Sequence, residues 1–135
     1  MNKESAKSWI VKSWHHYKSG VILYDALHYT DTIAVDLHYA IEIMLKSLLA
    51  YDNKKIIKTH DLVEIYDNIK QYIDFNEDEL LLLDIITTYH IKESYPALDR
   101  TMPSRNEIKE VLEFTKELLE RICKILKIDI SRLDD

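Results

Sequence analysis

The stretch His38-Tyr-Ala-Ile-Glu-Ile-Met-Leu-Lys-Ser-Leu-Leu49 decides the fold of this chain. Its apolar residues, together with the preceding leucine, recur at steps of three and four residues. They therefore form one wide apolar stripe on an α-helix: Leu37, Ala40, Ile41, Met44, Leu45, Leu48 and Leu49. Glu42 and Lys46 lie one helical turn apart, in the order that favours an ion pair. The pattern predicts an amphipathic helix that packs its stripe into a core.

A second helix is expected to begin shortly after this stretch, at Thr59-His-Asp-Leu62. Threonine is a favourable N-cap residue, so Thr59 is the predicted cap. Asp61 then falls in the first turn, where a carboxylate suits the positive end of the helix dipole. We predict that this helix spans residues 60–72.

The rest of the chain shows the same helical periodicity. The helix of the opening stretch is predicted to span residues 29–50, and we predict further helices over residues 3–24, from 76 to the loop at 93–103, and from 104 to about 127. Gly20 interrupts the first helix and is expected to mark a close approach between helices. The expected caps are Thr30 or Asp31, Asn76 in a capping box with Glu79, and Ser104 in a capping box with Glu107.

The fold class follows from this pattern and from the composition. The chain has 1 Gly and 2 Pro, too few for the turns of a β-sandwich or barrel. We predict an all-α fold, an up-and-down bundle of four or five helices. Its core should include Met44, Leu45, Leu48, Ile108 and Leu112.

Length and composition also set the domain organisation and the compartment. The 135 residues are enough for one domain, spanning residues 1–135, with residues 129–135 expected to fray. The single Cys123 excludes an internal disulfide and is expected in the core. No apolar run approaches membrane-spanning length, and the predicted compartment is the cytoplasm. The net charge of −6 argues against nucleic-acid binding by the isolated chain.

Three short motifs together resemble the HEPN family of prokaryotic helical domains. They are Ala40-x-Glu42-x-x-Leu45-Lys46-x-x-Leu49, then Thr59-His60-Asp61-Leu62, then Tyr95-Pro96. The resemblance implies a helical bundle that often forms homodimers. It also implies pairing with a minimal nucleotidyltransferase in toxin–antitoxin-like modules, and the family's name records an early proposal of nucleotide binding.

Catalytic HEPN proteins resemble metal-independent ribonucleases that carry an Arg followed four to six residues later by a His. The guanidinium stabilises charge on a phosphate and the imidazole exchanges a proton. In this chain the first arginine is Arg100 and the last histidine is His90, so no such pair exists. The family's Arg-Tyr-Pro element is also changed, because Ser94 stands before Tyr95. The sequence therefore favours a protein without this activity, and an unusual site assembled in space is the alternative.

The candidate ligand-binding residues come from the three motifs: Glu42, Lys46, His60, Asp61 and Tyr95. Each has a structural alternative. Glu42 and Lys46 would form an ion pair at a solvated edge, and His60 would bond to the backbone or a carboxylate near a helix start. No Gly-rich phosphate loop is present, and we expect no cofactor.

Histidine and carboxylate pairs could in principle hold a metal. His38 and Glu42 share one helix face, and His15 and His16 are adjacent. Neither pair has a third ligand at a diagnostic spacing, so we expect no metal site.

Aromatic residues are numerous, with 9 Tyr and 2 Trp. Trp9 and Trp14 are five residues apart, and one helix seam does not easily bury both. We therefore expect a homodimer, with aromatic residues of the first helix or of residues 93–103 at its centre. The sequence thus predicts a protein that acts through partners. A ribonuclease toxin with a non-standard site and a nucleotide-binding module are the alternatives.

Overall fold

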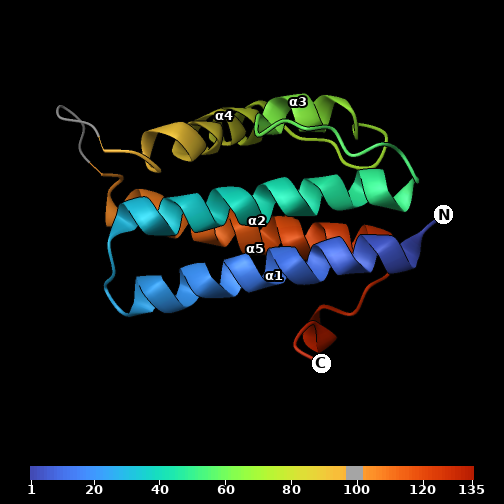
Figure 1. The fold of residues 1–135 in the computed structure, drawn as a ribbon, viewed down its shortest axis with the longest axis horizontal. Coiled ribbons are helices and arrows are strands. Elements are labelled where there is room, and N and C mark those ends of the chain that lie inside the picture. Colours follow the sequence, from blue (N-terminus) through green and yellow to red (C-terminus); the bar gives the residue numbers. More distant parts are fainter. Residues whose placement is uncertain (97–101) are drawn as a thin grey trace.

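The computed structural model describes residues 1–96 and 102–135, and these residues contain helices and no β-strand. The α-helices are α1 (Lys3–Asp25), α2 (Thr30–Tyr51), α3 (Leu62–Asp67), α4 (Glu77–Lys92) and α5 (Arg105–Leu126). A short 3-10 helix, η1, follows at Ile130–Arg132. Figure 1 shows the long helices lying side by side, with α3 and α4 in line on one side of α2. The all-α bundle expected from the sequence is confirmed.

Helix α2 is the centre of the bundle. It contacts α1, α3, α4 and α5. The seven apolar residues of its predicted stripe are all buried, and so is every residue from Met44 to Ala50. A helical segment that is buried on every side, as residues 44–50 are, must be covered by neighbours on every side. The other α-helices provide this cover, which fixes where residues of α2 can meet side chains from elsewhere.

Helices α1 and α2 pack closely because α1 carries Gly20 at their contact. A Cβ atom at this position would lie 2.9 Å from Leu37 Cδ2, closer than normal packing allows. Near the middle of the pair, the Ser13 hydroxyl donates a hydrogen bond of 2.6 Å to the Ala40 carbonyl. The close approach expected at Gly20 is therefore confirmed.

The start of α3 differs from the prediction. The helix begins at Leu62, and Asp61 caps it by accepting hydrogen bonds from the N–H groups of Val63 and Glu64. The prediction of Thr59 as the cap is wrong, because its hydroxyl instead accepts a hydrogen bond from the Asp61 N–H. Residue 60 stays outside the helix because its carbonyl and its ring are bonded to α2.

The length of α3 also differs from the prediction. The helix ends at Asp67, and the chain continues through tight turns instead of the helix expected to residue 72. In these turns the Ile69 N–H bonds to the Tyr66 carbonyl and the Tyr72 N–H bonds to the Ile69 carbonyl. The buried Ile69 continues the apolar side of the segment, which is why the sequence pattern resembles that of a longer helix.

The caps of α2 and α4 contrast with each other. The prediction that Thr30 or Asp31 caps α2 is wrong. The N-cap of this helix is Tyr29, which makes no side-chain capping bond. Helix α4 has the full predicted capping box between Asn76 and Glu79.

Helix α5 shows one half of its predicted capping box. The Ser104 hydroxyl accepts a hydrogen bond from the Glu107 N–H. The Glu107 carboxylate accepts a hydrogen bond from the Tyr89 hydroxyl of α4, and so ties α4 to the start of α5. The predicted core residues Ile108 and Leu112 are buried on the inner face of α5, as is Cys123.

The C-terminal segment, residues 129–135, folds back onto the bundle instead of fraying as the sequence predicts. Asp129 caps η1, and Leu133 is 2% exposed. The Trp14 indole N–H donates a hydrogen bond of 2.6 Å to the Asp134 carboxylate. Figure 1 shows the resulting turn beside α1. Local sequence patterns do not reveal this anchor, because its two partners are far apart in the sequence.

No helix in the described part of the chain combines the length and the hydropathy that spanning a bilayer requires.

We predict that Leu45→Ala lowers the free energy of unfolding by about 2–5 kcal/mol, because it opens a cavity in a closely packed core. Leu45 is 0% exposed, whereas Ile22 is 62% exposed. The control Ile22→Ala should change the free energy by less than about 0.5 kcal/mol. Urea denaturation of both variants measures the difference, and similar small losses would contradict the burial of Leu45.

Candidate functional site

Three imidazoles from different parts of the chain meet beside one buried carboxylate. His38 lies on α2, His60 precedes α3, and His90 lies near the end of α4. The ring centroids are 3.9 Å apart for His60 and His90, 5.3 Å for His38 and His90, and 6.4 Å for His38 and His60. Glu42 provides the carboxylate, one turn after His38 on α2. We name these four residues, together with Lys46, the histidine cluster.

Glu42 is the centre of the hydrogen bonding in the histidine cluster. Its carboxylate accepts a bond of 3.0 Å from the Lys46 ammonium and a bond of 2.8 Å from His60 Nδ1. The side chains of Glu42 and Lys46 are each 8% exposed. Burial by itself raises the pKa of Glu42, but the hydrogen bonds from His60 and Lys46 outweigh it and the pKa is lowered. The carboxylate is therefore ionised and paired at neutral pH.

His38 connects α2 to the segment before α3. Its Nε2–H donates a hydrogen bond of 2.9 Å to the His60 carbonyl, so Nδ1 is the unprotonated nitrogen of the neutral ring. Nδ1 lies 3.8 Å from the Glu42 carboxylate and has no hydrogen-bond partner among the described residues. Burial lowers the pKa of His38 below its usual value.

His90 completes the cluster from α4. Its ring stacks on His60 at an interplanar angle of 27°, and Tyr39 meets it edge-on. Its buried Nδ1 has no hydrogen-bond partner within the described part of the chain. The pKa of His90 is lowered, first by burial and then by the nearby His60. Both His38 and His90 are thus held in the neutral form.

The chemistry available here centres on the Glu42–His60 pair. The carboxylate holds the Nδ1–H of His60, which leaves Nε2 as a proton acceptor. The His60 side chain is 53% exposed, so this nitrogen can reach solvent or a bound molecule. Such a pair can move a proton, but Lys46, the cation of the cluster, is buried and bonded to Glu42. The cluster thus has a general base without a free cation to hold a phosphate.

The structure brings together three of the five predicted site residues. Glu42, Lys46 and His60 are in direct contact. Asp61 is adjacent to them but serves as the cap of α3. Tyr95 lies beyond the end of α4 and is 69% exposed. The ion pair predicted for Glu42 and Lys46 is present, but it is buried and does not lie at a solvated edge.

His90 is absent from the site that the sequence predicts, and His38 enters that prediction only as a candidate metal ligand. The sequence does contain one indication for His90. It follows Leu83 and Ile86, which are buried, at steps of three and four residues, so it lies on the inner side of α4. Among the described residues, no group of His, Cys, Asp or Glu has a geometry that could hold a metal ion.

The chain was compared with known families and structures. A model of the HEPN domain matches residues 6–126. The chain belongs to the HEPN family. No curated protein sequence matches it. The crystal structure of TT1696 from Thermus thermophilus is similar, with a TM-score of 0.74 and 19% identity over 93% of this chain and 99% of that one. This likeness shows that the two chains share a fold.

We predict that acid destabilises the protein through His38. Its pKa is lowered in the folded state, so the unfolded chain binds the proton first. The contribution of neutral His38 is complete above about pH 6.5 and is lost as the pH falls below that value. Urea denaturation at about pH 7.5 and about pH 5.5 measures the loss.

The matched test of this prediction uses two glutamine variants. His38→Gln keeps an amide donor for the His60 carbonyl but cannot bind the proton, so its stability should fall less on acidification. His15→Gln replaces an exposed histidine of α1 and should behave like the parent protein. Equal acid sensitivity in all three proteins would show that His38 is not the responsible group.

Proposed function

We propose that this HEPN protein acts through protein partners and not through catalysis of its own. In this proposal it forms a homodimer and pairs with a minimal nucleotidyltransferase in a toxin–antitoxin-like module. The nucleotidyltransferase follows from the family resemblance. The homodimer is supported by one observation in the structure, the apolar residues that α4 leaves exposed.

Helix α4 exposes apolar side chains on the face that points away from α2. Leu81 is 62% exposed, Ile85 45% and Ile91 69%. Tyr95, which follows the end of the helix, is also 69% exposed. We name these four residues the α4 surface. Monomeric proteins seldom leave clustered apolar side chains in water, so the α4 surface supports a protein interface.

The charges of α4 favour a second copy as the occupant of the α4 surface. The first turn carries Glu77 and Asp78, and the last turn carries Lys92. In an antiparallel pairing of two α4 helices, the acidic turn of each copy lies opposite the basic turn of the other. A two-fold dimer satisfies both pairs at once and brings the apolar residues together between them.

Of the two places that the sequence offers for the dimer interface, the first helix is not part of the proposed interface. Trp9 and Trp14 of α1 are partly buried, and Trp14 is bonded to the C-terminal segment. The first helix therefore offers less aromatic surface than its composition implies. Tyr95 remains from the segment of residues 93–103 that the sequence also offers as an interface.

A second candidate function is metal-independent RNA cleavage at the histidine cluster. His60 and His90 are stacked, and Glu42 accepts a hydrogen bond from His60. The two imidazoles could therefore serve as the base and the acid of the reaction. The buried Lys46 argues against it, because it leaves no free cation in the cluster to stabilise a phosphate. The burial of Lys46 and its bond to Glu42 also argue against a nucleotide bound by this lysine.

We predict a homodimer in solution at micromolar concentration. Light scattering should give twice the 16.0 kDa mass of one chain. Leu81→Asp should shift the protein to monomer, because it places a carboxylate in an interface that needs about 1,200 Å² of buried area. Ile22→Asp is the matched control, since Ile22 on α1 is as exposed as Leu81.

A strict monomer, or equal dissociation by both variants, would contradict the proposed dimer. Co-expression with a nucleotidyltransferase encoded beside this chain tests the second partner. A complex that copurifies with the parent protein supports the module, and separate elution of the two proteins argues against it.

We predict that the purified protein does not cleave RNA in the presence of a chelator. The reason is the missing arginine and the paired Lys46. Gel analysis of labelled RNA measures the outcome. Cleavage that disappears in His60→Ala and in His90→Ala would replace the partner proposal with the ribonuclease.

A further inference from the structure

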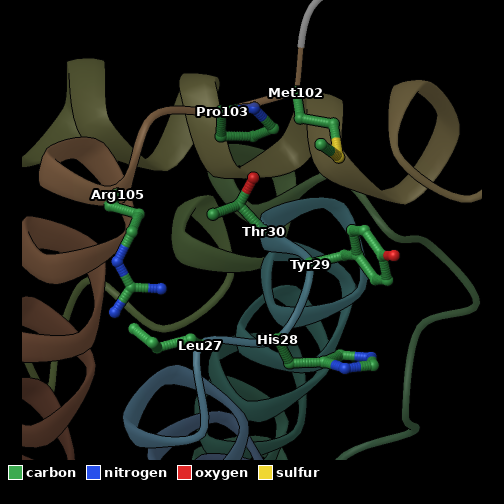
Figure 2. Close-up of a pocket in the computed structure, with 7 residues that line it drawn as sticks. All are labelled: Leu27, His28, Tyr29, Thr30, Met102, Pro103 and Arg105. Carbon is green, nitrogen blue, oxygen red and sulfur yellow. The ribbon is translucent and has the colours of Figure 1, made fainter.

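The folded-back C-terminal segment forms a pocket with the first turns of α1. Its volume is about 380 Å³. Val11, Ile128 and Leu133 provide apolar lining, and the latter two are buried at 8% and 2% exposure. The polar lining is dominated by cations: Lys3, Lys7, Lys127 and Arg132. We name this the basic pocket, and it shares no residue with the histidine cluster, the α4 surface or the pocket beside the start of α2 drawn in Figure 2.

The charge of the basic pocket is opposite to that of the whole chain. The chain has a net charge of −6, yet four cationic side chains and two carboxylates line this pocket. Asp129 is occupied by hydrogen bonds from the Ser131 N–H and hydroxyl. Asp135 is paired with Arg132. Across residues 1–96 and 102–135, the structure shows no ion pair for Lys3, Lys7 or Lys127.

Two of these lysines stand where the helix itself disfavours them. Lys3 is the first residue of α1, at the positive end of the helix dipole, where a cation is unfavourable. Lys7 lies one turn further, and like charges at this spacing also repel. Local conflict of this kind is expected where a residue serves a ligand more than the fold. An anion in the pocket would relieve both conflicts.

We propose that the basic pocket binds a small molecule with a di- or triphosphate group. Lysine ammonium groups bind phosphate oxygens as point charges, and the three lysines suit a group with several negative charges. The apolar lining from Val11, Ile128 and Leu133 suits an organic part attached to the phosphates. Ordering of the C-terminal segment by Trp14 and Leu133 keeps the two walls of the pocket together.

The test is calorimetric titration of the full chain with sodium tripolyphosphate at low ionic strength. We expect one site per chain, with an affinity that falls as salt is added. Lys7→Gln should weaken binding about tenfold, because it removes one charged hydrogen-bond donor. Lys12→Gln, an exposed lysine of α1 outside the basic pocket, should leave the affinity unchanged.

Two outcomes would overturn the proposal. The first is the absence of binding at low ionic strength by a protein whose circular dichroism shows the intact helical fold. The second is equal weakening by Lys7→Gln and Lys12→Gln, which would mean diffuse attraction to any lysine. An oligo-aspartate peptide of equal charge is titrated alongside. Equal affinity for the peptide would also overturn the phosphate assignment, whereas weaker affinity supports it. None of these outcomes depends on the dimer or on a nucleotidyltransferase.

Discussion

The burial of the last turns of α2 on all sides is the constraint on which the rest of the structure depends. From Met44 to Ala50 every residue of this helix is buried. A helix in this position is stable only when neighbours cover each face, since exposed apolar area costs free energy in proportion to its size. The hairpin with α1, the amphipathic α5 and the α3–α4 segment supply this cover. Gly20 shows how tightly the cover fits, because a larger residue there would meet Leu37.

The same burial explains the histidine cluster. Polar residues on a buried helix must find partners, because a buried charge without one is strongly unfavourable. Glu42 finds Lys46 on its own helix and His60 on the next segment, and His38 finds the His60 carbonyl. These bonds attach the segment before α3 to α2 and keep it extended, so that α3 begins only at Leu62. The cluster thus has a clear structural role, and the half-exposed His60 is the part of it that a ligand could reach.

The surfaces proposed to carry function lie away from this centre. The exposed apolar side chains of the α4 surface and the lysines of the basic pocket, such as Leu81, Ile91 and Lys7, are not part of the core. This separation has a practical consequence. Substitutions on these surfaces can remove an interaction without unfolding the bundle, whereas substitutions in α2 or the histidine cluster change stability and function together.

Local sequence patterns determined the helices, most of the core and part of the site. The stripe on α2, the inner face of α5 and the cap of α4 are set by residues three or four positions apart, which periodicity and capping rules can detect. The absence of an Arg that precedes a His, and with it of the family's ribonuclease motif, can also be read from the sequence alone. Tertiary structure decided the rest: the start of α3, the anchored C-terminal segment and the approach of His90 to His60. Each depends on partners far apart in the chain, such as Trp14 and Asp134, whose meeting is set by how the helices pack around α2.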